Sequence, residues 1–433
     1  MPQSPLLLQI VVILCAARLL GLVLRYAGQP AVLGEMAAGL VLGPIVFGLV
    51  APELHGWLFA PTSLGALDGL SQVGLVLVMF IVGAELRLPA GLRGDLAAAT
   101  LVGMASVLVP MLLGLGVAAL AYADLAPAGV DFWSFALFLA AAMSITALPV
   151  MARILKDRGM TQSAVGRLSL TSAAVADVLA WIMLSLVVAL AGSGHDWGRF
   201  LRLLFGLALF LAGMFWIVRP ACAWLLRRHA ADGRPGGSVL ATLLIALFAC
   251  AYGTTLLGAH PVFGAFVFGA SLPRDERLLE ALVERIEYVA IVVLMPIFFA
   301  LAGLGTTSSA FVGASLGTFM LVLVASVSGK VLGSTAAARV AGQPWRVALA
   351  VGSLMNARGL MELIVIKVGL DLGVIGPELF TILFVMAIVT TAMTGPMLTA
   401  ILGSAKLGPA RVADKASAVS RGKEPGAGPD LLS

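Results

Sequence analysis

Apolar stretches about as long as the hydrocarbon core of a bilayer is thick recur along almost the whole chain. Short segments in which proline, glycine and charged residues gather separate them. About 20 apolar residues in a helix cross a bilayer core of roughly 30 Å, so each stretch predicts a membrane-spanning helix. We therefore expect an all-α integral membrane protein with about thirteen transmembrane helices. The predicted spans are 5–26, 31–51, 66–86, 97–122, 132–155, 164–190, 199–219, 238–257, 261–272, 285–304, 310–337, 346–369 and 377–402.

The amino-acid composition agrees with this pattern. Of the 433 residues, 61% are hydrophobic and only 11% are charged, whereas soluble domains contain about 25% charged residues. The three cysteines have spacings unlike those of zinc sites or disulfide frameworks. The sequence shows no nucleophile–base set, metal cluster or phosphate-binding loop, so we expect neither an enzyme nor a cofactor.

Lysine and arginine residues are distributed unevenly between the two sides of the predicted membrane. Of the 27, twenty lie in one set of alternate loops and in the C-terminal segment. The opposite loops hold Arg199, Arg202 and Lys367, and the spans hold Arg18, Arg167, Lys330 and Arg358. The positive-inside rule then predicts that the N-terminus lies outside and the C-terminus in the cytoplasm, which requires an odd number of spans. We expect a multi-pass protein of the cell (plasma) membrane. The net charge of +5 thus reflects topology, and we expect no nucleic-acid partner.

Two parts of the chain are distinguished by composition. Residues 1–403 form the predicted transmembrane domain, whereas residues 404–433 combine three prolines and mixed charge with few apolar side chains. A segment of that kind does not bury enough apolar surface to fold, so we expect a disordered cytoplasmic tail.

A weak internal repeat runs through the predicted spans. Residues 80–86 in the third span resemble residues 299–304 in the tenth, and residues 143–149 in the fifth correspond to residues 354–359 in the twelfth. Each pair is seven spans apart, so its members point in opposite directions across the membrane. Inverted repeats are a common plan of secondary transporters. We expect two such repeats, at about 5–190 and 238–402, joined by a linker helix at about 199–219.

The fifth and twelfth spans both contain residues that interrupt helices. Pro149 removes a backbone donor in the fifth, and Asn356 and Gly359 occupy the matching place in the twelfth. Unwound backbone at this depth is tolerated where it lines protein or water, and its carbonyl groups bind cations. The two spans therefore predict discontinuous helices that cross mid-membrane, although each interruption alone also suits a simple kink.

Asp177 lies near the middle of the sixth span. A carboxylate in hydrocarbon costs roughly 2.5–3.5 kcal/mol on insertion scales, so a chain keeps one only where it is paired, hydrated or titrated. We interpret Asp177 as the group for which a monovalent cation and a proton compete. The alternative is a structural carboxylate paired with Lys330 or Arg358.

Other polar residues of the spans are candidates for supporting roles. The hydroxyl groups of Thr146, Thr171 and Ser172 would offer neutral oxygens to a hard cation, although such hydroxyls commonly bond to their own helix. Lys330 lies deep in its span and would supply a competing positive charge. Arg358 and Glu362, four residues apart, face each other on one helix and predict a self-neutralising structural pair.

Five ordered sequence blocks resemble the second monovalent cation:proton antiporter family, which includes bacterial sodium or potassium/proton exchangers and plant cation/proton exchangers. The blocks are residues 28–44, 144–155, 166–181, 258–269 and 355–365. The resemblance implies an antiporter fold of a homodimer, in which a core domain rocks against a dimerising domain. It also implies that cation and proton share Asp177, that Thr146 and neighbouring carbonyls form the cation site, and that Lys330 stands opposite the aspartate.

One residue departs from the family pattern. Members carry Asp-Asp, Asn-Asp or Gln-Asp at this point, whereas this chain has Ala176 before Asp177. Because a single carboxylate exchanges one proton for one monovalent ion, we expect electroneutral exchange. The departure leaves two alternatives open: a proton-coupled transporter of another solute, or an ion sensor or subunit without turnover of its own. The sequence does not decide between sodium, potassium and lithium.

Overall fold

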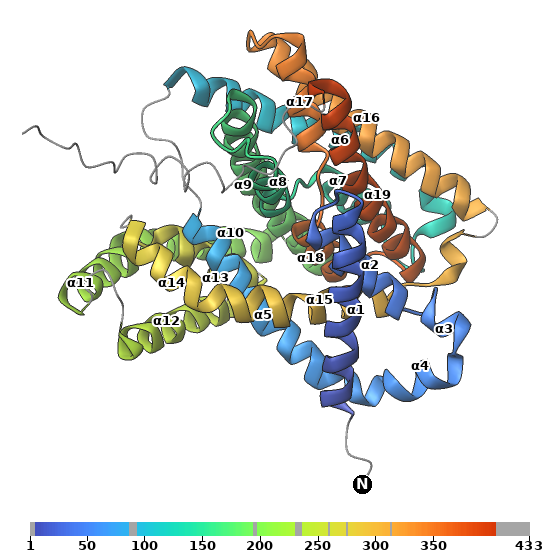
Figure 1. The fold of residues 1–433 in the computed structure, drawn as a ribbon, viewed down its shortest axis with the longest axis horizontal. Helices are drawn as coiled ribbons and strands as arrows, with labels where there is room; N and C mark the ends of the chain where they lie inside the picture. Colours follow the sequence, from blue (N-terminus) through green and yellow to red (C-terminus); the bar gives the residue numbers. More distant parts are fainter. Residues whose placement is uncertain are drawn as a thin grey trace, which may run out of the picture.

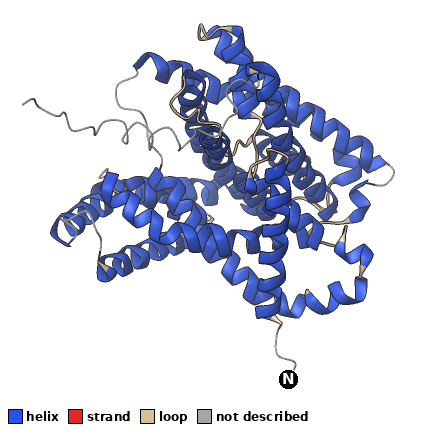
Figure 2. Cartoon of the chain, viewed as in Figure 1, coloured by secondary structure: helices blue, strands red, loops and turns tan. Residues whose placement is uncertain are grey.

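The computed structural model of this chain describes residues 5–85, 93–193, 197–229, 236–258, 260–273, 276–311 and 314–403. The predicted disordered tail, residues 404–433, lies outside these ranges. Helices connected by turns and short loops make up the described ranges, and no strand occurs in them (Figure 2). The predicted all-α class is therefore confirmed.

A helix or a pair of consecutive helices lies at each of the thirteen predicted spans. Eleven of these segments are long and apolar enough to cross a membrane, counted over the described residues. The continuous spans are α1 (Leu6–Tyr26), α2 (Ala31–Leu42), α5 (Leu64–Glu85), α6 (Arg93–Leu125), α9 (Ala164–Ser193), α12 (Gly237–Leu256), α13 (Pro261–Ser271), α16 (Ala314–Val340) and α19 (Pro377–Leu402). The ninth, α13, has only 11 residues, as its short apolar stretch predicts.

The remaining spans consist of two helices each. The pairs are α7 (Phe132–Ser144) with α8 (Leu148–Asp157), α10 (Trp197–Gly213) with α11 (Arg219–His229), α14 (Glu276–Val289) with α15 (Met295–Leu304), and α17 (Trp345–Met355) with α18 (Leu360–Asp371). The second and third pairs continue through one π-helical turn each, η2 (Met214–Val218) and η3 (Ala290–Leu294). The first and last pairs are interrupted by extended backbone, so the two predicted discontinuous helices are present.

Some helical segments extend beyond the predicted spans. The helix α2 ends nine residues before the end of the predicted second span, 31–51, and the short helix α3 (Phe47–Val50) occupies the end of that range. The connection after it contains the short helix α4 (Pro52–Leu58). The tenth span begins nine residues early, with α14, because this helix is amphipathic. Its Leu282, Val283 and Ile286 are buried while charged residues occupy its other faces. Average hydropathy does not register a helix that buries one stripe and exposes another.

The helices pack as two bodies (Figure 1). One body, the core body, contains α6 to α9 and α16 to α19, and its labels gather in the upper part and on the right of the view. The other, the scaffold body, contains α1, α2, α5 and α12 to α15, with α10 and α11 linking it to α9. Contacts within each body far outnumber those between them, so each has its own helix packing.

The packing of the scaffold body follows the predicted inverted repeat. In that repeat the second and third spans (α2, α5) correspond to the ninth and tenth (α13, α15). Two close contacts of this body are α2 with α15 and α5 with α13, and the correspondence exchanges one for the other. In both contacts glycines leave no room for a β carbon: Gly39 meets Gly303, and Gly83 meets Gly269. Small residues let membrane helices approach closely and gain dispersion energy.

The Gly39–Gly303 contact gives a test of this packing. We expect Gly303→Val to lower the melting temperature of the detergent-purified protein strongly, since a side chain there meets the backbone of α2, which no rotamer change relieves. Overpacking of this kind costs about 1–3 kcal/mol or more. The control is Gly317→Ala in α16, where a β carbon meets no atom within 4 Å. Equal melting temperatures for Gly303→Val and the wild type would contradict the close contact.

Candidate ion-binding site

The extended interruptions of the two broken spans cross each other within the core body. The helix α7 ends at Ser144, Ile145 to Ala147 are extended, and α8 begins at Leu148. The backbone N–H of Ala147 donates to the carbonyl of Ala357 at 3.1 Å. The hydroxyl of Thr146 donates to the carbonyl of Met355, the last residue of α17, at 3.5 Å. Four half-helix ends thus meet around one crossing.

Arg358 stabilises the C-terminal end of α7 at this crossing. Its guanidinium donates to the carbonyls of Ala142 at 3.2 Å and Met143 at 2.6 Å, and it forms an ion pair with Glu362 at 3.1 Å. Arg358 and Glu362 are both fully buried. The final carbonyls of a helix have no partner within it and carry partial negative charge, which a cation neutralises. The arginine therefore pairs with its predicted carboxylate and also caps a broken helix.

Lys330 reaches the same helix end from α16. Its ammonium group donates to the carbonyl of Ser144 and to the hydroxyl of Thr146, the latter at 2.5 Å, and its side chain is fully buried. The charges of Lys330 and Asp177 interact, but the hydrogen bonds of the lysine go to the interruption and not to the carboxylate. Lys330 thus binds the interruption directly and lies within electrostatic reach of Asp177.

Asp177, on α9, is 1% exposed. Within the described part of the chain neither of its carboxylate oxygens has a hydrogen-bond donor, and the hydroxyl of the fully buried Ser172, five residues earlier on α9, has no partner either. Ala176 is buried beside them and brings no oxygen. A buried carboxylate is expected to be paired, protonated or bound to a cation. These oxygens are of the kind that hard cations bind.

The two candidate residues Thr171 and Pro149 have local roles in their own helices. Thr171 is half-buried, and its hydroxyl donates to the carbonyl of Arg167 on its own helix at 2.9 Å. Pro149 lies in the first turn of α8, where the missing N–H costs no helical hydrogen bond. The proline therefore begins the second half-helix, and the interruption itself lies just before it.

The predicted residues of the other interruption are held by packing and backbone bonds. The amide of Asn356 donates to the carbonyl of Thr390 at 3.0 Å. Gly359 lies against Val150 of α8, and a β carbon at this glycine would crowd that side chain. Both residues fix the crossing. The side-chain oxygen of Asn356 is buried and has no hydrogen-bond partner among the described residues.

Sequence reasoning missed a threonine of α19. Thr391 accepts a hydrogen bond from the N–H of Arg358 and donates one to its carbonyl, both at 2.8 Å. It supplies the partners that the backbone loses where the twelfth span unwinds. A signal was present, because Thr390, Thr391 and Thr394 gather within five residues of an otherwise apolar span.

A cavity of about 500 Å³ leads to the crossing from the side that carries most of the basic loops. It lies between the two bodies and ends at Leu148, Pro149 and Leu360, beside the interruptions. Charged residues along it come from both bodies: Glu35 from α2, Arg153, Lys156 and Asp157 from α8, and Glu287 from α14. The negative charge of Glu35 interacts with the positive charge of Arg153 across the boundary.

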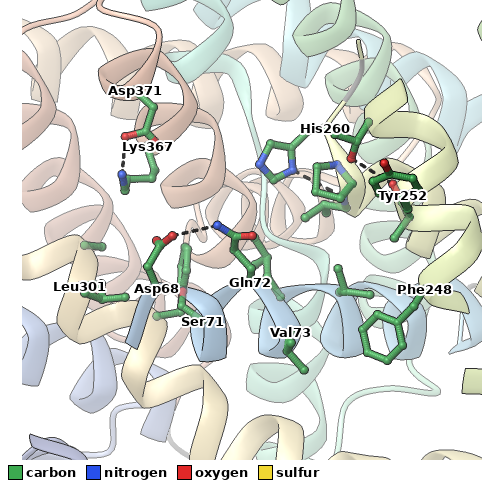
Figure 3. Close-up of a pocket in the computed structure, with 18 residues that line it drawn as sticks. Asp68, Ser71, Gln72, Val73, Phe248, Tyr252, His260, Leu301, Lys367 and Asp371 are labelled. Carbon is green, nitrogen blue, oxygen red and sulfur yellow. Dashed lines mark hydrogen bonds and ion pairs between the residues drawn. The ribbon is translucent and has the colours of Figure 1, made fainter. Parts of the chain in front are cut away.

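A second cavity, of about 490 Å³, lies at the other end of the same boundary (Figure 3). Asp68 accepts a hydrogen bond from Gln72 at 2.8 Å, and Lys367 forms an ion pair with Asp371. His260 precedes α13 and accepts a hydrogen bond from the N–H of Val262 at 3.5 Å through Nδ1. Burial lowers the pKa of His260 to about 4, so the imidazole is neutral at pH 7 and keeps this acceptor.

The two cavities approach each other along the same helices of the scaffold body. On α5, Val76 lines the second cavity and Val78 the first. On α15, Phe298 lines the second and Phe299 the first. Along these helices the residues that line the two cavities are thus separated by less than one helical turn.

Known proteins resemble this chain over almost its whole length. A family model described as "Sodium/hydrogen exchanger, transmembrane" matches residues 10–403. The Na(+)/H(+) antiporter NhaS4 of Synechocystis sp. is 38% identical over 92% of this chain and 97% of its own length. Cation/H(+) antiporter 17 of Arabidopsis thaliana is 36% identical and K(+)/H(+) antiporter 1 of Saccharomyces cerevisiae 32% identical, each over 92% of this chain. The chain spans about half the length of the plant and yeast relatives, 48% and 46%.

A solved structure has the same fold. The sodium proton antiporter MjNhaP1 from Methanocaldococcus jannaschii superposes with a TM-score of 0.55 over 91% of this chain and 98% of its own. Its sequence identity is 13%, so the likeness concerns the fold alone.

The capping role of Arg358 gives a test of the crossing. We expect Arg358→Gln to lower the melting temperature severely, because the Ala142 and Met143 carbonyls and the buried Glu362 carboxylate lose their partner. Breaking a buried ion pair on one side costs about 3–5 kcal/mol. The double variant Arg358→Gln/Glu362→Gln removes the leftover charge and recovers part of the loss. Lys367→Gln, which breaks a half-exposed pair, is the control and changes little. A double variant no more stable than the single one would count against this assignment.

Proposed function

This chain belongs to the sodium/hydrogen exchanger family, and we infer that it is a secondary antiporter that exchanges a monovalent cation, Na⁺ or K⁺, for protons across a membrane. Relatives that match more than nine-tenths of it are named as sodium or potassium antiporters. One observation carries the assignment of the site: a fully buried carboxylate without a hydrogen-bond donor lies beside two crossed, interrupted helices. We propose transport rather than enzyme chemistry for this site.

The exchange follows from the alternatives open to Asp177. The buried carboxylate is neutralised either by a proton or by a cation, and binding of one removes the charge that attracts the other. The unpartnered hydroxyl of Ser172 and the hydroxyl of Thr146 are the neutral oxygens that would complete the coordination of a cation. The carboxylate thus links the two ions without carrying both at once.

A bound cation would compete with a basic residue of the site for the same oxygen atoms. The ammonium group of Lys330 already occupies the Thr146 hydroxyl and the Ser144 carbonyl. A cation that uses the Thr146 oxygen takes the place of this group, so Lys330 is the built-in competitor for the site. Arg358 is balanced by Glu362 and stays with the end of α7.

The cavities give the route to the site. We propose that the core body moves against the scaffold body, so that the crossing is reached alternately from the two ends of their boundary. The distribution of basic residues supports an orientation in the cell membrane with the N-terminus outside and the C-terminus in the cytoplasm. A homodimer formed through the scaffold body is part of the same proposal.

The ion exchange is tested directly in liposomes that contain the purified protein and a trapped pH dye. With a proton gradient imposed, we expect Na⁺ or K⁺ to restore the dye signal in the wild type, and Li⁺ is added in the same series. Asp177→Asn is expected to remove the response, because an amide neither binds a proton nor attracts a cation.

A matched control shows whether the effect of Asp177→Asn comes from the site or from the removal of any one carboxylate. Asp124→Asn changes an exposed aspartate at the end of α6 and should leave the rate within about twofold of the wild type. A wild type that binds ions without restoring the signal would indicate a sensor. A wild type that responds only to another solute would indicate a changed substrate. Full activity of Asp177→Asn would refute the assignment.

Charge movement is a separate expectation. Since one carboxylate exchanges one proton for one monovalent ion, and Ala176 adds no second acidic or amide group, we expect no net charge to cross the membrane. Proteoliposomes adsorbed on a solid-supported membrane should show no current on a jump in cation concentration, under conditions in which the dye assay reports exchange. A current that scales with the exchange rate would overturn electroneutrality and leave the antiport assignment intact.

A further inference from the structure

A third cavity lies on the side of the basic loops and is larger than the two at the body boundary. Its volume is about 900 Å³, and we call it the arginine groove. The C-terminal end of α1 and the turn into α2 line one side, and α8 and α19 line the other. Its charged residues are Arg25, Arg153, Asp157 and Arg158. Three guanidinium groups and one carboxylate leave it strongly positive.

The three arginines differ in how they are held. Arg158 is fixed by hydrogen bonds to the Thr399 hydroxyl at 3.1 Å and to the Gly395 carbonyl at 2.9 Å, which orient its planar guanidinium in the groove. The side chains of Arg25 and Arg153 form no hydrogen bond or ion pair within 4 Å among the contacts of the described residues. Arg153 interacts with Glu35 at longer range. Two cationic side chains are therefore available to a ligand beside one that is already positioned.

The backbone adds to the positive potential. The 12-residue helix α2 begins at Ala31, which lines the groove together with the preceding Gly28 to Pro30. The chain turns into this helix at Gly28, whose φ of 71° suits glycine. The first N–H groups of a helix have no partners within it and carry partial positive charge, so its start favours an anion. The helix start and the arginines face the same cavity.

We propose that the arginine groove binds a phosphate-bearing anion that bridges α1 and α8. Guanidinium groups bind phosphate oxygens in pairs of parallel hydrogen bonds, and several of them converging on one cavity favour a ligand with more than one negative charge. The sources of such a group at a membrane surface are the headgroup of an acidic phospholipid and a soluble phosphate compound. The transported cation is repelled from this groove by its charge.

The groove is distinct from the cavity that reaches the helix crossing, although Arg153 and Asp157 line both. Arg25 belongs to the scaffold body, whereas Arg153 and Arg158 belong to the core body. An anion held by both sides therefore joins the two bodies at this face. Binding of the anion to both bodies is measured without any transport assay.

The test measures binding to the full chain in nanodiscs. The probes are phosphatidylglycerol mixed into phosphatidylcholine discs, inorganic phosphate, and ATP without a divalent cation, each against NaCl at equal ionic strength. The wild type should show a rise in melting temperature with at least one probe. Arg25→Gln and Arg153→Gln should each weaken the apparent affinity roughly tenfold, since each removes charge-assisted hydrogen bonds. Arg227→Gln removes an exposed arginine of α11 that does not line the groove, and should stay within about twofold.

Each outcome either identifies the source of the bound anion or overturns the proposed site. A response to phosphatidylglycerol alone identifies a lipid headgroup, and a response to phosphate or ATP identifies a soluble compound; both support the site. No response to any probe, or equal weakening by Arg227→Gln, would overturn it. Weakening by only one of the two groove variants would overturn the bridge. Because Arg25 is exposed at a helix end, Arg25→Gln gives an answer even where Arg153→Gln fails to fold.

Discussion

The satisfaction of backbone carbonyls at the end of a helix that stops inside the protein is the constraint on which the rest of this structure depends. The helix α7 ends at Ser144, and the carbonyls of Ala142, Met143 and Ser144 face no water from the bulk and no next turn of helix. Such groups cost several kcal/mol each when left unpaired in a membrane protein. Arg358 and Lys330 supply the donors. The interrupted span is stable because two cations are buried with it.

Burying two cations determines the charges of the site. Glu362 neutralises Arg358 through a direct ion pair, whereas Asp177 balances Lys330 without a hydrogen bond between them. With all four groups ionised the charges sum to zero, yet Lys330 donates no hydrogen bond to Asp177, because the ammonium group is engaged by the interruption. A carboxylate in that position retains free oxygens. Because Lys330 is needed to bind the carbonyl at the end of α7, it does not donate to Asp177, and the carboxylate oxygens stay free to bind a proton or a cation.

The sequence predicts features that depend on local composition and residue order, such as helices and their interruptions. It misses features that depend on which residues, distant in sequence, form hydrogen bonds in the fold. Hydropathy predicted the thirteen spans and proline, asparagine and glycine predicted the two interruptions, because both are local properties of the chain. The sequence did not predict that Lys330 and Arg358 would bind carbonyls. Every residue carries a carbonyl, and only the fold determines which carbonyls are left without a helical hydrogen-bond partner. Thr391 was missed for the same reason. The amphipathic α14 was placed late because a window average hides a helix with one buried stripe.

The proposed exchange places unequal demands on the two bodies. The scaffold body is locked by glycine contacts between α2 and α15 and between α5 and α13, where backbones touch and sliding is blocked. On the scaffold body the distance between the two cavities is short. Val76 lines one and Val78 the other, and they are two residues apart on α5, about 3 Å along the helix axis. On α18 of the core body, Leu360 and Lys367 mark the two cavities and are seven residues apart, roughly 10 Å. A core body that slides along a fixed, thin barrier therefore changes the side from which the crossing is reached, while the carbonyl caps of α7, all internal to the core body, move with it unbroken.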